Sequence, residues 1–175
     1  MKNSVDAERV CGFYVSNMHF ATMILPFINR EIKEETNFIT FFELNQKSNI
    51  NTVLSGVVAN LEDKEKIIKI DWGDTKILKI SDVEKKIKNI STGNNIILVC
   101  GREEYIDMVN SYINKYIDKN RKKLANLKIK IIDCFEVNSF NENIRQILAT
   151  HNKIINSSGE HEISEIFEGY NSNAG

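Results

Sequence analysis

Polar side chains directly follow each of five apolar stretches in this sequence, at the points where strands would pass into loops. If those stretches are parallel strands, their carboxyl ends meet at one edge of a sheet, where open α/β proteins bind ligands. Polar residues are also typical of any strand-to-loop exit, so this pattern predicts a binding edge and not a particular ligand. The candidate ligand-binding rim consists of Ser16, Asn17, His19, Glu43, Asp71, Trp72, Gly101, Arg102, Glu136 and Asn138.

Three rim residues have the chemistry of a metal site or a general base. His19, Glu43 and Asp71 could converge at adjacent strand ends, but their spacing does not require it. The sequence contains no H-E-x-x-H, no paired Cys/His set and no G-x-S-x-G. For His19, and equally for His151 and His161, we expect a structural or solvent-exposed role. We expect no catalytic residue and no metal.

The stretch CGREEY offers a possible anion site. Gly101 and Arg102 lie at a predicted strand end, where the amides of a helix start can hold a phosphate. However, Glu103 and Glu104 stand in the first turn of the following helix and already complement its dipole. No G-x-x-x-x-G-K-[ST] and no G-x-G-x-x-G is present, so we expect no cofactor. The alternative interpretation of this turn is a helix cap followed by a surface arginine.

The single tryptophan, Trp72 in DWGDT, has two interpretations. Following a strand and preceding a glycine, it could form an aromatic wall for a flat or apolar ligand. Alternatively, it could cap the hydrophobic core beneath a loop. We favour the second interpretation, and keep Trp72 among the rim candidates.

The elements that must position these residues alternate regularly. Strands are predicted over 10–16, 38–44, 66–72, 95–101 and 128–137, and helices over 19–35, 49–61, 81–90, 103–127 and 141–155. Ser81 and Glu84 have the spacing of a capping box. Pro26, the only proline, either kinks the first helix or begins a second one. Strands that are apolar on both faces require helices on both sides of a mainly parallel sheet.

The expected fold is therefore α/β: a single three-layer domain with about five mainly parallel strands, of Rossmann-like or RecA-like form. It should occupy residues 1–160. Residues 161–175 should form an amphipathic segment, built on Ile163, Ile166, Phe167 and Tyr170, and then a flexible tail. A chain of 175 residues suits one domain.

Composition excludes several classes of protein. With 23 Lys and Arg against 24 Asp and Glu, the net charge is −1, which gives no reason to expect nucleic acid as a partner. No apolar run approaches the roughly 18 residues of a membrane span, and the start does not resemble a signal peptide. We expect a cytoplasmic protein without membrane contact. Cys11, Cys100 and Cys134 each lie in an apolar run, which predicts buried, reduced thiols.

The segment from residue 11 to about residue 43 also resembles a known family. The motifs GFYVSNMHF, ILPFI and FITFFE, with a looser likeness at IDW, resemble the MEDS domain of methanogen and methylotroph sensory proteins. The resemblance implies a RecA-like α/β fold without a working phosphate loop. It also implies sensing of small, often apolar compounds by domains attached to regulators or histidine kinases.

Together these features favour a non-catalytic sensory or regulatory domain that binds a small ligand or a regulatory protein partner at the strand ends. Two alternatives stay open. One is a small Rossmann-like enzyme acting on a nucleotide or other phosphorylated metabolite, with Arg102 as the anion holder. The other is an assembly subunit that docks through its C-terminal segment. A homo-oligomer is compatible with each.

Overall fold

One six-stranded sheet runs through the protein, seen in a computed structural model that describes residues 7–137 and 143–167. The strand order is β2-β3-β4-β1-β5-β6. Strands β1 to β5 are parallel to their neighbours, and β6 pairs antiparallel with β5. The α/β class with a mainly parallel sheet is therefore confirmed, but the sheet has six strands instead of five. They are β1 (Ala7–Tyr14), β2 (Asn37–Phe42), β3 (Asn94–Gly101), β4 (Lys128–Glu136), β5 (Lys153–Asn156) and β6 (Gly159–Glu162).

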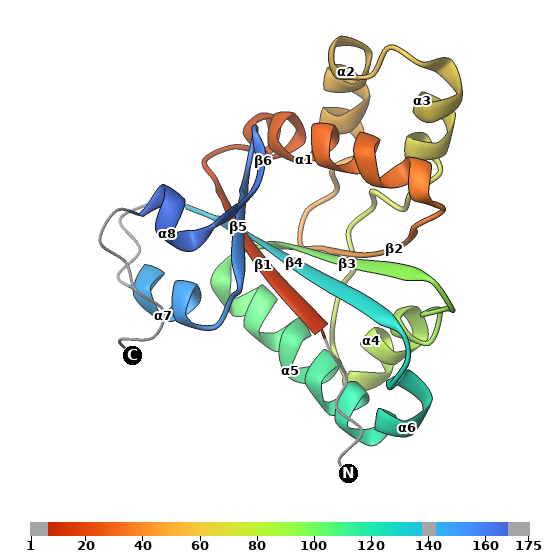
Figure 1. Ribbon diagram of the computed structural model, residues 1–175, viewed down its shortest axis with the longest axis vertical. Coiled ribbons are helices and arrows are strands. Elements are labelled where there is room, and N and C mark those ends of the chain that lie inside the picture. The colour runs from red at the N-terminus through yellow and green to blue at the C-terminus, as the bar shows by residue number, and fades with distance from the viewer. Residues whose placement is uncertain (1–6, 138–142, 168–175) are drawn as a thin grey trace.

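Helices cover both faces of the sheet, as the apolar strands require. Residues of β1 to β5 join two separate hydrophobic clusters, one on each face of the sheet, because neighbouring side chains of a strand point to opposite faces. One face packs against α1 (Asn17–Glu31), α2 (Lys47–Val57) and α3 (Leu61–Ile68), and a short 3₁₀ turn (Ile32–Glu34) follows α1. Figure 1 shows these helices on one side of the sheet and α4 to α6 on the other. The second face packs against α4 (Ile80–Ile87), α5 (Glu103–Lys119), α6 (Arg121–Leu124), α7 (Ile144–Ala149) and α8 (Ile163–Ile166).

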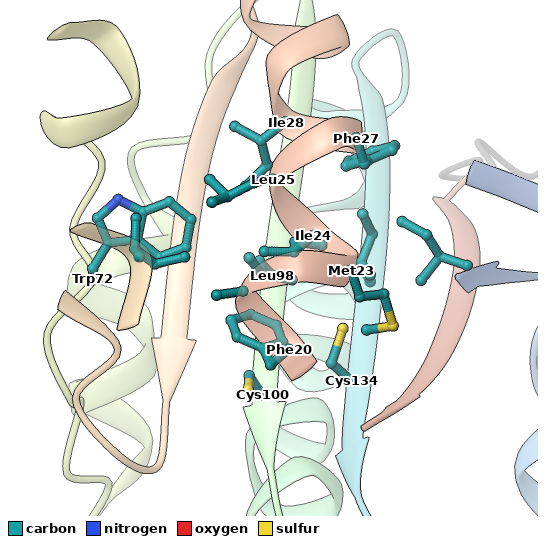
Figure 2. Close-up of a cluster of buried hydrophobic side chains, with 14 of the residues drawn as sticks. Phe20, Met23, Ile24, Leu25, Phe27, Ile28, Trp72, Leu98, Cys100 and Cys134 are labelled. Atoms are coloured by element: carbon teal, nitrogen blue, oxygen red, sulfur yellow. The ribbon is translucent and has the colours of Figure 1, made fainter. Parts of the chain in front are cut away.

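Helix α1 forms the centre of the first hydrophobic cluster. Phe20, Ile24 and Ile28 recur every four residues and are almost completely buried, because this spacing keeps them on one helical face. Figure 2 shows this face of α1 lying over Leu98 of β3 and its neighbours. Each such side chain contributes about 1.5–3 kcal/mol by leaving water. Pro26 lies inside one continuous helix, so the alternative in which it begins a second helix is wrong.

The predicted strand over 66–72 is not a strand. Helix α3 occupies this stretch as far as Ile68, begun by Asn60, whose side chain accepts the backbone N–H of Asp63. So few apolar residues fit the spacing of a helix and that of a strand equally well, and the cap at Asn60 favours the helix. The chain then runs beside β2 without joining the ladder, and the backbone N–H of Thr75 donates to the Phe42 carbonyl at 2.8 Å.

The predicted helix over 141–155 is too long, because α7 ends at Ala149 and strand β5 begins at Lys153. Asn152 exchanges two hydrogen bonds with Arg9 of β1, at 2.7 and 2.8 Å, and these place the following residues beside β1. A two-residue loop then joins β5 to β6, with Asn156 opposite Gly159. Gly159 has φ of +113°, a conformation that favours glycine. The boundary expected after residue 160 falls inside β6.

Two other helix limits differ from expectation. Helix α4 begins at Ile80, and its start is held by Asp82, whose carboxylate accepts the backbone N–H groups of Leu78 and Lys79. The predicted capping box of Ser81 and Glu84 is therefore wrong. The predicted helix over 103–127 is divided, because α5 ends at Lys119 and α6 occupies only four further residues.

The C-terminal segment packs on the domain's own second cluster. Ile163 is 4% exposed and Phe167 is half-buried against that cluster, whereas Ile166 is 41% exposed. Tyr170 lies outside the described residues. Within the described part of the chain, no helix is long and apolar enough to cross a membrane.

All three cysteines are buried free thiols, as predicted.

Candidate functional site

The turn from β1 into α1 is closed by its own side chains. Ser16 caps the helix by accepting the backbone N–H of His19 at 3.1 Å. The Nδ1 atom of His19 in turn accepts the backbone N–H of Val15 at 3.0 Å. Two amides at this strand end are therefore satisfied within the turn, and Ser16 and His19 have a local structural role.

Glu43 and Arg102 form the strongest contact among the rim candidates. The Glu43 carboxylate accepts the Arg102 backbone N–H at 3.0 Å, Nε at 3.1 Å and Nη2 at 2.9 Å. Gly101 makes this approach possible, since a Cβ there would lie 2.7 Å from the Cβ of Glu43. Hydrogen bonds from Arg102 lower the pKa of Glu43, and Glu43 raises that of Arg102. The guanidinium is thus already paired with a carboxylate, which weakens the expectation that Arg102 holds a phosphate.

Trp72 lies in the hydrophobic core and not on the rim. It is 4% exposed, its ring stacks on Phe42 at 5.6 Å between centroids, and its Nε1 donates to the Ile67 carbonyl. The interpretation of Trp72 as a core cap is confirmed. Asp71, its neighbour, accepts a hydrogen bond from Lys86 at 3.4 Å on the outer side of β2.

The remaining rim candidates do not complete a site with these residues. Asn17 accepts a hydrogen bond from the side chain of Gln46 at 3.2 Å. Glu136 ends β4 beside Tyr14 of β1. Asn138 lies outside the described residues.

His19, Glu43 and Asp71 do not converge. Each has a different partner, namely the Val15 amide, Arg102 and Lys86. In the two described ranges, no group of three or more His, Cys, Asp and Glu side chains could hold a metal ion.

A polar cleft lies elsewhere, between α5 and α7 on the second face of the sheet. Its volume is about 330 Å³. Side chains of α5 and α7 form its walls, and residues of β1 and β4 form its floor. We call it the α5–α7 cleft. Sequence reasoning missed it, because it lies beneath the helices and not at the strand ends.

Asp133 is the central residue of the cleft floor. It is 1% exposed, although it lies in the middle of the buried strand β4. Its Oδ1 atom accepts a hydrogen bond from Asn110 of α5 at 2.8 Å, and its Oδ2 atom lies 2.8 Å from Nε2 of His151. Burial of a carboxylate is costly unless its oxygens have such partners. The two partners come from opposite sides of the cleft, so Asp133 joins α5 to the residue that follows the C-cap of α7.

The orientation of both partners is fixed by further contacts. Arg9 donates to the amide oxygen of Asn110 at 3.2 Å, which leaves the Asn110 NH₂ group to face Asp133. The Nδ1 atom of His151 lies 2.6 Å from the Ile147 carbonyl. Both ring nitrogens of His151 are thus in contact with polar groups of the protein. This connected set, Arg9, Asn110, Asp133 and His151, can position a bound molecule but has no free base.

A second arrangement lies on the β5–β6 hairpin. The Oγ atom of Ser158 is 2.7 Å from Nε2 of His161, and Nδ1 of His161 is 3.4 Å from a carboxylate oxygen of Glu165. The same hydroxyl lies 2.7 Å from Oδ1 of Asn156, which also accepts the Ser158 backbone N–H. The order of these groups resembles that of a serine nucleophile with its base, on an exposed hairpin tip.

The thiols offer no nucleophile. Burial raises the pKa of Cys11 and of Cys100 to about 12, and that of Cys134 well above its usual range.

Neither the comparison with protein-family models nor the comparison with curated proteins finds a match to this chain.

Proposed function

We propose that this protein is a non-catalytic sensory or regulatory domain that binds a small ligand in the α5–α7 cleft. The observation that carries the proposal is the buried Asp133 carboxylate on the cleft floor, with both oxygens and both of its partners fixed in orientation. A polar set of this kind, in a cleft of about 330 Å³, has the composition of a small-molecule site. For Asp133 and His151 the fixed partners favour binding over proton transfer, because a general base needs a free nitrogen or oxygen that faces the substrate.

The resemblance to the MEDS family supports the same function from the other half of the chain. That family implies sensing of small compounds by a RecA-like fold without a phosphate loop. The mainly parallel sheet, with helices on both faces, is compatible with such a fold. The closed turn at Ser16 and His19 occupies the position at which such folds place the phosphate loop.

A ligand screen with a blocked cleft tests the proposal. Small cationic, neutral and anionic metabolites are added separately, and thermal unfolding is followed by circular dichroism. Gln146→Trp places an indole at an exposed position of the cleft wall, and Arg145→Trp places the same indole on α7 outside the lining. At least one compound should raise the Tm of the wild type and of Arg145→Trp but not of Gln146→Trp, and mass spectrometry should recover it unchanged. Absence of any such compound, or its conversion to product, would overturn the proposal.

The Ser158, His161 and Glu165 arrangement favours a second candidate function, an esterase-like hydrolase. The Ser158 oxygen would attack the carbonyl of an activated ester while its proton passes to His161, and the ester's alcohol would leave with that proton. Water would then hydrolyse the acyl-serine, which releases the acid and restores the Ser158 hydroxyl. Turnover of p-nitrophenyl acetate that is lost in both Ser158→Ala and His161→Gln would support this candidate. Equal rates in wild type and both variants would exclude it.

A further inference from the structure

The charges around the α5–α7 cleft are unbalanced. Glu103 and Asp107, one turn apart on α5, and Asp133 on the floor bring three carboxylates to the lining. Among the lining residues that the structure describes, Arg9 is the one arginine or lysine, and its guanidinium already donates to the amide oxygens of Asn110 and Asn114.

Asp107 differs from the other two carboxylates of the lining, because the described residues provide no partner for it. Among the residues that the structure describes, none makes a hydrogen bond or an ion pair with its side chain, whereas Asn143 donates to Glu103 at 3.1 Å. Partial burial, and then the negative charges of Glu103, Asp133 and Glu104, raise the pKa of Asp107. A positive charge placed beside Asp107 would relieve this repulsion.

Apolar side chains complete the lining. Ile106 of α5, Phe135 of β4 and Ile147 of α7 are buried side chains that reach the cleft. They provide contact for a short hydrocarbon chain next to the carboxylates. The volume of about 330 Å³ is at the small end of the range for ligand pockets.

We infer that the α5–α7 cleft binds a small organic amine, with its ammonium group against Asp107 and Glu103 and its hydrocarbon part against Ile106, Phe135 and Ile147. This inference rests on the proposed function, because it names the class of ligand for the same cleft. An anion would instead lie among three carboxylates. A bare metal ion would need a closer group of ligands than the described residues provide.

Matched isosteres test the ligand class. Straight-chain primary amines of increasing length are compared with the alcohols and carboxylates of the same chain length, by ¹H–¹⁵N chemical-shift titration of the full chain. The amines should shift the amides of α5, α7 and β4 around the cleft, and the alcohols and carboxylates should not. Added salt should weaken the effect, because part of the binding is electrostatic.

A pair of α5 variants tests the contact. Asp107→Asn should weaken amine binding by about tenfold or more, since a hydrogen bond to a charged group is worth at least about 1.5 kcal/mol. Glu104→Gln removes the same charge from the same helix outside the cleft lining, and should change the affinity by less than about threefold. An equal loss in both variants would mean a general charge effect and would overturn the inference.

The outcomes separate the inference from the proposed function. If alcohols or carboxylates bind in the cleft and amines do not, the ligand class is wrong and the sensory function stands. If no compound of either this series or the metabolite screen binds in the cleft, both are wrong.

Discussion

Replacing His151 with phenylalanine should destabilise the protein by about 3 kcal/mol. Phenylalanine keeps a ring beside Phe135, whose ring centroid lies 6.1 Å from that of His151, but has no N–H to donate. The Oδ2 atom of Asp133, now 2.8 Å from Nε2, would lose its partner while the Asp133 side chain stays 2% exposed. Breaking a buried pair in this way costs about 3–5 kcal/mol. The hydrogen bond from Asn110 persists, which places the expected cost at the lower end.

The double variant separates this cost from a simple loss of packing. Asp133→Leu combined with His151→Phe replaces the pair with two apolar side chains, each larger than the one it replaces. It should recover at least about 2 kcal/mol relative to His151→Phe alone, because no buried carboxylate is left without a donor. The informative quantity is therefore the difference between the change in unfolding free energy of the double variant and the sum of the changes of the two single variants.

Urea unfolding provides the assay. Far-UV circular dichroism is followed together with the fluorescence of Trp72, the only tryptophan, which is buried and reports on the first cluster. His161→Phe is the matched control, since the His161 side chain is 26% exposed, and it should cost less than about 0.5 kcal/mol. A cost below about 1 kcal/mol for His151→Phe, or strictly additive changes in the double variant, would refute the reasoning.

Two further predictions concern titratable groups. Because Arg102 lowers the pKa of Glu43, this contact stabilises the folded state above the unfolded pKa of Glu43 and is lost as pH falls through the folded value. As the pH falls from about 5 to about 3, the free energy of unfolding should therefore decrease less for Arg102→Ala than for the wild type, as measured by urea titrations. Parallel plots of unfolding free energy against pH for the two proteins would contradict this. At pH 8 the folded protein should resist iodoacetamide, because burial raises the pKa of Cys11 and Cys100 to about 12 and that of Cys134 well above its usual range. Mass spectrometry should find three adducts only after denaturation, and rapid labelling of any one cysteine without urea would be inconsistent with the burial.

Local sequence signals predicted most of the elements correctly. Apolar runs identified the strands β1, β2, β3 and β4, which pack on both of their faces. The helical period of apolar residues identified α1 and α5, which pack along one stripe. The errors occurred where tertiary contacts decide a short segment. Asn152 turns the chain toward Arg9 and makes strand β5 from residues with a helical pattern. The hairpin after β5 did have a local signal, the Gly159 that closes a two-residue loop.

The candidate site was less predictable than the fold. Of the rim candidates, Glu43, Gly101 and Arg102 lie together in the structure, since their strands are neighbours in the sheet. The sequence does indicate that Asp133 has polar partners, because an acidic residue in the middle of a buried strand needs them. Those partners are Asn110 of α5, 23 residues before Asp133, and His151, 18 residues after it and just beyond α7. No spacing rule connects them, so only the packing of α5 and α7 could reveal the cleft.

The segment that runs beside β2 affects whether another strand can pair with this edge of the sheet. On the side of β2 that faces away from β3, the Thr40 carbonyl accepts from Lys86 and the Phe42 carbonyl accepts from Thr75. An exposed edge strand normally offers such groups to a foreign strand, which leads to strand addition and to aggregation. Here those two acceptors are occupied from within the chain. A foreign strand that pairs with β2 at this edge would therefore have to displace Lys86 and Thr75 from these two carbonyls.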